Sequence, residues 1–147
     1  MFKPLVSIII PNLNGEKFLE DCLESLREQT CRNFEIILID NGSTDNSVSR
    51  AKKFFPEVKI IKNQENLGFA KANNQGFEIS KGEYIATLNN DTVVDRNWLK
   101  ELVAVAEKDE NIGMVASKIL LAKEGNKIDS VGVNIALDGM TKQRGGL

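Results

Sequence analysis

The run Leu5-Val6-Ser7-Ile8-Ile9-Ile10, followed directly by Pro11, decides the fold of this chain. A nearly continuous series of β-branched and apolar residues is typical of a strand that is buried on both faces. We expect the strand to end at Pro11. Strands of this kind occur in parallel sheets that helices cover on both sides. This stretch therefore favours an α/β fold.

The segment after this strand has the apolar spacing of a helix. From Glu16 to Gln29, apolar side chains recur every three or four residues, which is the signature of an amphipathic helix. The unit then repeats, with strands expected over 34–39, 58–61 and 83–88, and helices expected over 45–55, 69–80 and 97–108. Such alternation predicts right-handed crossovers. The predicted fold class is α/β, a doubly wound, mostly parallel sheet with helices on both faces.

The pattern changes near the C-terminus. Residues 114–121 and 131–135 are both strand-like, and no helical spacing separates them, so we expect a hairpin or another antiparallel addition. The last stretch, 138–147, has no hydrophobic period and is expected to be a loop. We expect one domain over 1–147 that lacks its C-terminal end.

Composition excludes several classes of function. A net charge of −2 with scattered Lys and Arg offers no surface for nucleic acid. No apolar run approaches the ~20 residues of a membrane span, and the N-terminus lacks a secretory cleavage signal, so we expect a cytoplasmic protein. The two cysteines, Cys22 and Cys31, are not spaced as a metal site, and histidine is absent. Carboxylates, amides and hydroxyls are left for any chemistry.

The candidate ligand residues follow the predicted strands. In open parallel sheets, ligands bind beyond the carboxyl ends of the strands, where loop amides and helix N-termini converge. The residues that we predict to form such a site are Pro11, Asn12, Asn14, Asp40, Asn41, Gly42, Ser43, Asn66, Gly68, Asn73, Asn89, Asn90 and Asp91.

Asp40 follows a wholly apolar strand. At the sheet edge its carboxylate could accept the ring N–H of a uracil or thymine. The alternative is that 40–45 is only a turn into the next helix, with Ser43 or Thr44 as N-cap and Asp45 favourable to the helix dipole. The sequence leaves both interpretations open.

Asp91 ends the turn Asn89-Asn90-Asp91 after the fourth predicted strand. Mg²⁺ and Mn²⁺ take oxygen ligands, usually one or two carboxylates completed by phosphates and water, and Asp91 is the best candidate ligand. The alternative makes Asp91 an ordinary turn residue. For nearby Asp95 we favour a structural part, as the N-cap of the following helix.

Four segments together resemble a known family: 6–15, 39–45, 65–70 and 88–91. In this order and spacing they resemble the N-terminal half of family 2 glycosyltransferases with the GT-A fold, especially the rhamnosyltransferase-like branch, over about residues 4–121. The resemblance implies a nucleoside-diphosphate-sugar donor, UDP- or dTDP-linked, with its base near Pro11 and Asp40 and its diphosphate on Mg²⁺ or Mn²⁺ at Asp91.

The chain departs from the family pattern at two places. Asp91 matches the last acid of the family's Asp-x-Asp motif, but Asn89 replaces the first acid. Relatives often read Ala-Arg-Asn where this chain has Ala72-Asn73-Asn74. The resemblance therefore does not imply a contact between the donor and a cationic side chain of this helix.

The resemblance also implies a reaction. Family members transfer the sugar with inversion, using a carboxylate base from a Glu-Asp type motif well after the metal site. Beyond residue 110 the aspartates are Asp129 and Asp138, and both lack that context, so the base is expected beyond Leu147. The implied partners are a glycan or lipid-linked acceptor, in polysaccharide biosynthesis, with peripheral membrane association.

Other functions are less consistent with the sequence. A sugar-1-phosphate nucleotidyltransferase needs a glycine-rich loop after the first strand, a dinucleotide-binding domain needs GxGxxG there, and a response regulator needs an acidic pair. The chain has Pro11-Asn12-Leu13-Asn14 in that place. A nucleotide-binding module without catalysis stays open.

Overall fold

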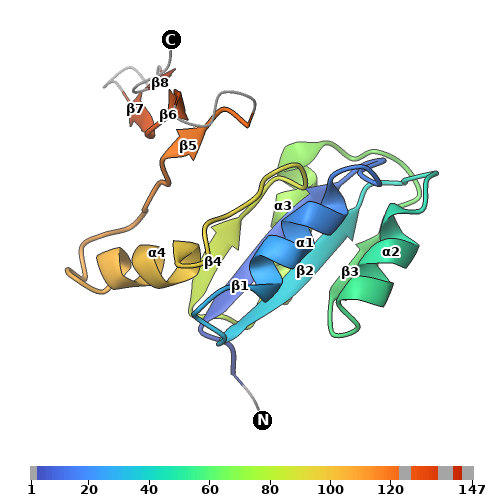
Figure 1. Ribbon diagram of the computed structural model, residues 1–147, viewed down its shortest axis with the longest axis horizontal. Coiled ribbons are helices and arrows are strands. Elements are labelled where there is room, and N and C mark those ends of the chain that lie inside the picture. The colour runs from blue at the N-terminus through green and yellow to red at the C-terminus, as the bar shows by residue number, and fades with distance from the viewer. Residues whose placement is uncertain (1–2, 123–126, 136–140, 144–147) are drawn as a thin grey trace. The chain divides into compact units, whose positions relative to one another are not determined.

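The computed structural model describes residues 3–122, 127–135 and 141–143. The chain divides into two compact units, Met1–Lys100 and Glu101–Leu147. In chain order the elements are β1 (Val6–Asn12), α1 (Leu19–Arg27), β2 (Phe34–Asp40), α2 (Ser47–Phe54), β3 (Lys59–Lys62), α3 (Phe69–Ile79), β4 (Tyr84–Thr87), α4 (Trp98–Ala106), β5 (Ile119–Leu120), β6 (Ile128–Ser130), β7 (Val133–Ile135) and β8 (Thr141–Gln143) (Figure 1).

The first unit contains a four-stranded sheet of order β3-β2-β1-β4. All of its strand pairs are parallel, and the long pairing of β1 with β2 runs from Val6 opposite Phe34 to Asn12 opposite Asp40. Helices α1 and α2 cover one face of this sheet and α3 covers the other (Figure 1). The predicted doubly wound α/β architecture is therefore confirmed.

Close packing of α3 on the sheet depends on Gly76. Ile9, Ile37 and Ile39 form a buried cluster with Ala72 of α3. A Cβ atom added at Gly76 would lie 2.5 Å from Cγ2 of Ile9, far inside normal contact. The glycine in this helix therefore lets the helix backbone approach β1 directly.

The prediction that Pro11 ends the first strand is wrong, because β1 continues to Asn12. The carbonyl of Ile9 accepts from Leu88 after β4, whereas that of Asn12 accepts from Asn41 after β2. Because backbone groups alternate in direction along a strand, position 11 points to the β4 side. β4 has already ended opposite Ile9, so the missing N–H of Pro11 breaks no hydrogen bond of the sheet.

Helix α1 begins later than predicted, at Leu19 rather than Glu16. The carbonyl of Gly15 accepts hydrogen bonds from Phe18 and Leu19, so a turn precedes the helix. The expected apolar face is present, since Leu19, Cys22, Leu23 and Leu26 are all buried.

The start of α4 is held by a buried amide that the sequence did not single out. Gln29 Oε1 accepts the N–H of Leu99 at 3.0 Å, and its Nε2 donates to the carbonyl of Asp95 at 2.7 Å. The Asp95 carboxylate accepts the N–H of Asn97 at 2.8 Å. Asp95 therefore fixes the turn ahead of α4, although the helix itself begins at Trp98.

The second unit carries the expected antiparallel addition, with different pairing. β5 pairs with β6, and β7 pairs with β8. The predicted strand over 114–121 contracts to Ile119–Leu120, and Thr141–Gln143 forms a strand where we expected a loop. Strands this short show no hydrophobic alternation in the sequence, so only their backbone pairing in the structure identifies them. Asp138 lies outside the described residues. None of the described helices is long and apolar enough to cross a membrane.

Glu35 ties three segments together at the amino ends of β1 and β2. Its Oε1 accepts from Ser7 Oγ at 2.6 Å and from the N–H of Lys81 at 2.8 Å, and its Oε2 pairs with Lys59. Ser7 Oγ also accepts the N–H of Gly82 at 2.9 Å. Burial would raise the pKa of Glu35, but the hydrogen bonds from Lys59, Ser7 and Lys81 outweigh it and lower that pKa.

We predict that Glu35→Gln destabilises the fold by about 1–3 kcal/mol at pH 7, because it removes charge-assisted hydrogen bonds. A carboxyl whose pKa is lower in the folded state stabilises the fold above its unfolded pKa of about 4.3, and this contribution is lost as pH falls through the folded value. The gap between wild type and variant in urea unfolding should therefore shrink toward pH 3.

Exposed Glu57→Gln is the matched control and should change stability little at either pH. A gap for Glu35→Gln that is constant from pH 7 to pH 3 would contradict the role of the charge.

Candidate functional site

The topology creates a crevice beside β1. From β1 the chain builds the sheet outward through β2 and β3, and it then returns to place β4 on the other side of β1. At such a switch point the loops after neighbouring strands diverge, and ligands bind between them. Asn12, Asp40 and the turn 89–91 all lie at the carboxyl ends of these strands. The predicted ligand residues therefore gather at one edge of the sheet.

Asn12 is the centre of this edge. Its side chain is only 2% exposed. Nδ2 donates to Ser43 Oγ at 3.1 Å and to Ser47 Oγ at 3.0 Å, and Oδ1 accepts from Asn90 Nδ2 at 2.8 Å. Asn12 thus joins the loops that follow β1, β2 and β4.

The loop after β2 is held against the loop after β1. Ser43 Oγ accepts the backbone N–H of Asn14 at 3.0 Å, and Asn14 Oδ1 accepts that of Thr44 at 2.8 Å. Asn14 itself has φ of 50°, a left-handed conformation that asparagine tolerates better than most residues. Asp40 is 4% exposed, and its Oδ1 accepts the N–H of Ser43 at 3.2 Å.

A second group of amides connects β2, β3 and α3. Asn63 Nδ2 donates to Asn41 Oδ1 at 2.8 Å and to Gln75 Oε1 at 2.8 Å, and Gln75 returns a bond to Asn63 Oδ1 at 2.9 Å. Asn41 Nδ2 donates to the carbonyl of Gly68 at 3.4 Å. Asn41 therefore positions the loop before α3 from its buried place at the end of β2.

The loop before α3 also requires two glycines. Gly42 has φ of 81°, and a Cβ atom there would lie 3.1 Å from backbone atoms of Glu65. Gly68 has φ of 84°, and its N–H donates to Asn66 Oδ1 at 2.9 Å. The predicted residues of this loop therefore shape the backbone, and Asn66 does so through its side chain.

Asn73 has an unmatched acceptor. Its Nδ2 donates to the carbonyl of Phe69 at 3.0 Å. Its Oδ1 is inaccessible to solvent and finds no donor among the residues that the structure describes. A buried acceptor without a partner is unfavourable, so a ligand donor that reached this atom would stabilise it.

Asp91 is exposed at the end of the turn after β4. Beneath the turn, Cys22 Sγ lies 3.7 Å from the carbonyl oxygen of Asn89. Burial first, and the negative charge of Asp91 second, raise the pKa of the Cys22 thiol to about 12. The thiol is therefore protonated at neutral pH.

The donor set of this turn fits a hard cation. The part of the chain that the structure describes contains no group of three or more His, Cys, Asp or Glu side chains that could hold a metal. A closed zinc-type site is therefore not formed there. One carboxylate with neighbouring amide oxygens matches Mg²⁺ or Mn²⁺, which keep several waters and take substrate phosphates.

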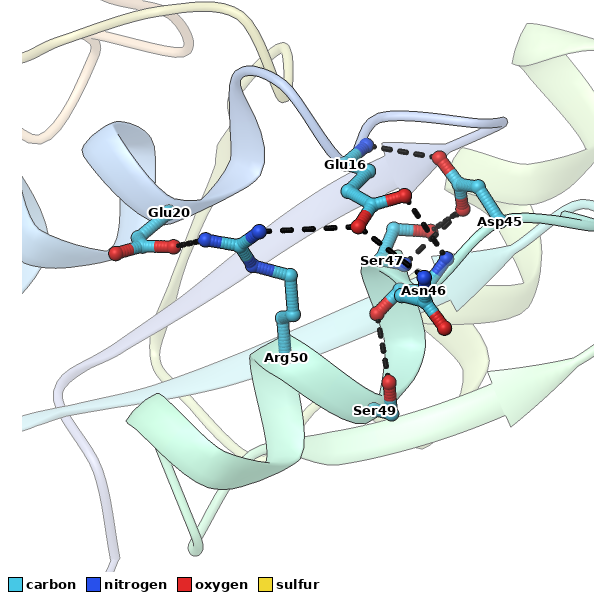
Figure 2. A network of polar contacts seen from close by, with 7 residues as sticks. All are labelled: Glu16, Glu20, Asp45, Asn46, Ser47, Ser49 and Arg50. Atoms are coloured by element: carbon cyan, nitrogen blue, oxygen red, sulfur yellow. Dashed lines mark hydrogen bonds and ion pairs between the residues drawn. The ribbon is translucent and has the colours of Figure 1, made fainter.

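A polar clamp holds the start of α2 to the segment before α1 (Figure 2). Asp45 Oδ2 accepts the N–H of Glu16 at 2.9 Å, and its Oδ1 accepts the N–H and hydroxyl of Ser47. Glu16 accepts from the backbone and side chain of Asn46 and also pairs with Arg50. Burial would raise the pKa of Asp45, but the Ser47 and Glu16 hydrogen bonds lower it.

This clamp corrects the alternative in which Ser43 or Thr44 caps the helix. The helix begins at Ser47, and Asp45 accepts the Ser47 N–H. Ser43 instead bonds to Asn12 and Asn14. Residues 40–45 are therefore more than a simple turn, because their side chains hold the loop after β1.

Two pockets of the described surface lie away from the carboxyl ends of β1, β2 and β4. One is lined by Arg27, Arg32, Phe34, Glu35, Ile36, Phe54, Phe55, Pro56, Glu57 and Val58. The other, beside the clamp, is lined by Glu16, Glu20, Asn46, Ser49, Arg50, Lys53 and Phe54.

Several residues of this edge were missed by the sequence-based prediction. Ser47 and Asp45 are bound to the Asn12 network, and Gln75 completes the Asn63 pair. Polar residues at a helix start and an amide inside an amphipathic helix are common, so neither carried a specific signal. Only the glycine of the first motif, Gly15, could have drawn attention to close packing there.

A family model and several relatives of known sequence point to the same protein family. The model of the family described as "Glycosyl transferase family 2" matches residues 7–130. The glycosyltransferase GlyG of Streptococcus pneumoniae serotype 4 is 38% identical over 112 residues, covering 74% of this chain and 37% of GlyG. A second relative, an uncharacterized glycosyltransferase of Haemophilus influenzae, is 35% identical and covers 86% of this chain and 41% of its own length. The chain thus spans about two fifths of these relatives.

Solved structures share the fold. S. aureus TarS, residues 1–349, in complex with UDP superposes with a TM-score of 0.67 at 25% identity, covering 71% of this chain and 32% of that chain. The mannosyltransferase PcManGT from Pyrobaculum calidifontis, solved with GDP-Man and Mn²⁺, gives 0.66 at 22% identity, covering 84% and 37%. These neighbours have the GT-A fold, as predicted. The rhamnosyltransferase-like branch and the single-domain boundary stay predictions.

We predict that Gly42→Ala lowers the free energy of unfolding by about 1–2 kcal/mol, because a side chain disfavours the left-handed backbone. The added Cβ would also press on the Glu65 backbone, so the loop before α3 should shift. Urea unfolding and the backbone amide shifts of residues 65–68 measure the two effects.

Gly113→Ala is the control, because it introduces the same methyl group into open space at a glycine without positive φ. If Gly42→Ala were as stable as Gly113→Ala, the constraint at Gly42 would be contradicted.

Proposed function

The chain belongs to glycosyl transferase family 2, and on that premise we propose that it supplies the donor and metal site for transfer of a sugar, with inversion, from a nucleoside diphosphate to an acceptor hydroxyl. The observation that carries this proposal is the convergence of Asp40 and the turn 89–91 on the two sides of β1, at the switch point of the sheet.

Asp40 is proposed to bind the nucleobase of the donor. A carboxylate that is 4% exposed is costly unless donors reach it, and the N–H of Ser43 uses only one of its lone pairs. The ring N–H of uracil or thymine is a suitable second donor. The UDP complex of TarS, which shares the fold at 25% identity, supports a uracil nucleotide as the first candidate.

Asp91 is proposed as the carboxylate ligand of Mg²⁺ or Mn²⁺. It is exposed at the same edge, so the diphosphate of a bound donor could complete the coordination. When bound, the cation stabilises the negative charge that develops on the departing diphosphate. Asn89 stands beside Asp91 as an amide in the place of a second acid, which leaves the site with a smaller negative charge.

The proposed reaction is a single displacement. The acceptor oxygen forms a bond to the anomeric carbon on the face opposite the diphosphate, and the bond to the diphosphate breaks with its electron pair. A carboxylate base takes the proton of the acceptor hydroxyl. Asp129 is exposed in β6 and is given no part in this step. The catalytic base stays a prediction, for the family's later motif.

The remaining predictions follow from the family. They are a UDP- or dTDP-linked sugar as donor, a glycan or lipid-linked acceptor, a part in polysaccharide biosynthesis and peripheral membrane association. The cytoplasmic location expected from the sequence also stays a proposal. The donor site is the part of the proposal that the chain itself can test.

We predict that UDP binds the chain more tightly with Mn²⁺ than without it, and that Asp91→Ala abolishes this gain. Loss of a direct metal ligand should reduce metal-dependent affinity by at least the roughly 10–100-fold that outer partners of a metal cost. Calorimetric titration of UDP with and without Mn²⁺ measures the gain. Exposed Asp21→Asn is the control and should keep it. A chain that binds no nucleoside diphosphate in either condition would overturn the donor site.

A different pattern is expected for Asp40→Ala. Removing a charged acceptor of the base should weaken UDP binding by roughly 10–100-fold, equivalent to about 1.5–3 kcal/mol. The loss of UDP affinity should be equal with and without Mn²⁺, because the nucleobase lies away from the cation. The same titrations check this. A loss confined to the metal-containing titration would place Asp40 at the diphosphate instead.

A further inference from the structure

We infer that Asn12 is a positioning residue, whose buried amide holds the turn 89–91 through Asn90 and so sets the place of Asp91. This inference rests on the proposed function and gives a part to a residue that sequence analysis treated as a direct ligand of the donor. With 2% of its side chain exposed and both polar atoms bonded to protein, Asn12 has little surface left for a ligand.

The orientation of the Asn12 amide is determined by its neighbours. The hydroxyl of Ser47 donates its hydrogen to the carboxylate of Asp45, which can only accept. Ser47 Oγ must therefore accept from its other partner, so Asn12 presents its NH₂ group to Ser47. This leaves Asn12 Oδ1 toward Asn90, and Asn90 must donate its own NH₂ group.

The result is a directed chain of hydrogen bonds from the turn after β4 to the start of α2. It runs from Asn90 to Asn12, from Asn12 to Ser47, and from Ser47 to Asp45. The N–H groups of Glu16 and Ser47 also bond to Asp45, so the far end of the chain is anchored in the clamp before α1 (Figure 2). Neither amide can rotate without breaking a bond. The Asn90 NH₂ group is directed to the protein, and its carbonyl oxygen is left for other partners.

Gly15 leaves the space that the bridge between the two amides needs. A Cβ atom at this position would lie 2.2 Å from Asn12 Oδ1 and 2.3 Å from Asn90 Nδ2. Gly15 does not have a positive φ, so its backbone conformation would accept alanine. The steric requirement therefore comes from the bridge itself, which makes Gly15→Ala a specific way to break it.

The bridge also explains how Asp91 can be placed without a ligand. The turn 89–91 follows a strand whose pairing with β1 ends at Thr87. Leu88 still donates its N–H to the carbonyl of Ile9 in β1. Past Leu88, the bond from Asn90 to Asn12 links the turn to the loops on the other side of the crevice. Pre-organisation of this kind reduces the entropy lost when a ligand binds.

The test uses Gly15→Ala, Asn90→Ala and the double variant. For each we measure the gain in UDP affinity that Mn²⁺ gives, as the ratio of Kd without and with metal. Each single variant should reduce the gain about 10-fold, as expected when a positioning partner is lost. Gly15 is not among the predicted ligand residues, so Gly15→Ala should leave metal-free affinity within about 2-fold. The double variant should lose no more than the worse single variant, because both changes break one bridge.

Two controls match the two substitutions. Gly113→Ala adds the same methyl group in open space, and Asn33→Ala removes an exposed amide at the opposite end of the sheet. Both should keep the full gain from Mn²⁺. Should Gly15→Ala fail to fold, Asn90→Ala still tests the bridge, because it removes a side chain and adds no clash.

A measurement without ligand separates this inference from the proposed function. In the wild-type chain, the side-chain NH₂ protons of Asn90 should exchange with solvent more slowly than those of Asn33 in NMR spectra. In Gly15→Ala this protection should disappear, and the Asp91 amide resonance should move.

Asn90 protons that exchange as fast as those of Asn33 would show that the bridge does not form. The bridge would be shown not to place Asp91 by either of two results. One is a double variant in which the two losses of the Mn²⁺-dependent gain multiply. The other is single variants that keep the full gain. Slow exchange in a chain that binds UDP without any gain from Mn²⁺ would instead overturn the metal site, and with it the purpose inferred for the bridge.

Discussion

The pairing of β1 with both of its neighbours is the constraint on which the rest of the first unit depends. β1 is buried along its length and stands between β2 and β4, so both rows of its backbone groups need partners. Pro11 lacks a donor on the β4 side and therefore fits only where β4 has already left the sheet. One imino acid is thus compatible with a long pairing to β2 and a short pairing to β4. This difference opens the crevice in which the polar loops meet.

The loops at that crevice are built from amides and hydroxyls more than from charges. Asn12 and Asn41 are nearly inaccessible, and a buried amide is unfavourable unless its donors and acceptors find partners. Each is satisfied by residues of other loops: Asn12 by Ser43, Ser47 and Asn90, and Asn41 by Asn63 and Gly68. Because the partners come from different strands, satisfying these amides also fixes how the loops lie. Asp40 and Asp91 are then presented from loops that these neutral amides and hydroxyls join.

Sequence reasoning predicted most of the first unit and little of the second. Buried strands and amphipathic helices of moderate length have a clear period, and all eight expected elements of the first pattern are present within a few residues. The ends of these elements were less predictable. Helix α2 begins at Ser47, whose N–H donates to Asp45, and Asp45 is held in place by its bond from the N–H of Glu16. β6 and β8 are too short to show a period, and only their partners define them.

By itself, the sequence determined the order of strands and helices, the parallel sheet and the rim where the candidate ligand residues gather, because hydrophobic period and chain connectivity act locally or through general rules of topology. It also singled out Asp40 and Asp91 as the carboxylates of that rim. Only the tertiary structure decided which rim side chains are exposed and which are bonded to other parts of the protein. Asn12 and Asn14 look alike in the sequence, yet Asn12 is buried and Asn14 is exposed. The reason is that a hydrogen bond between residues such as Asn12 and Asn90 depends on the spacing of two strands, which no local pattern records.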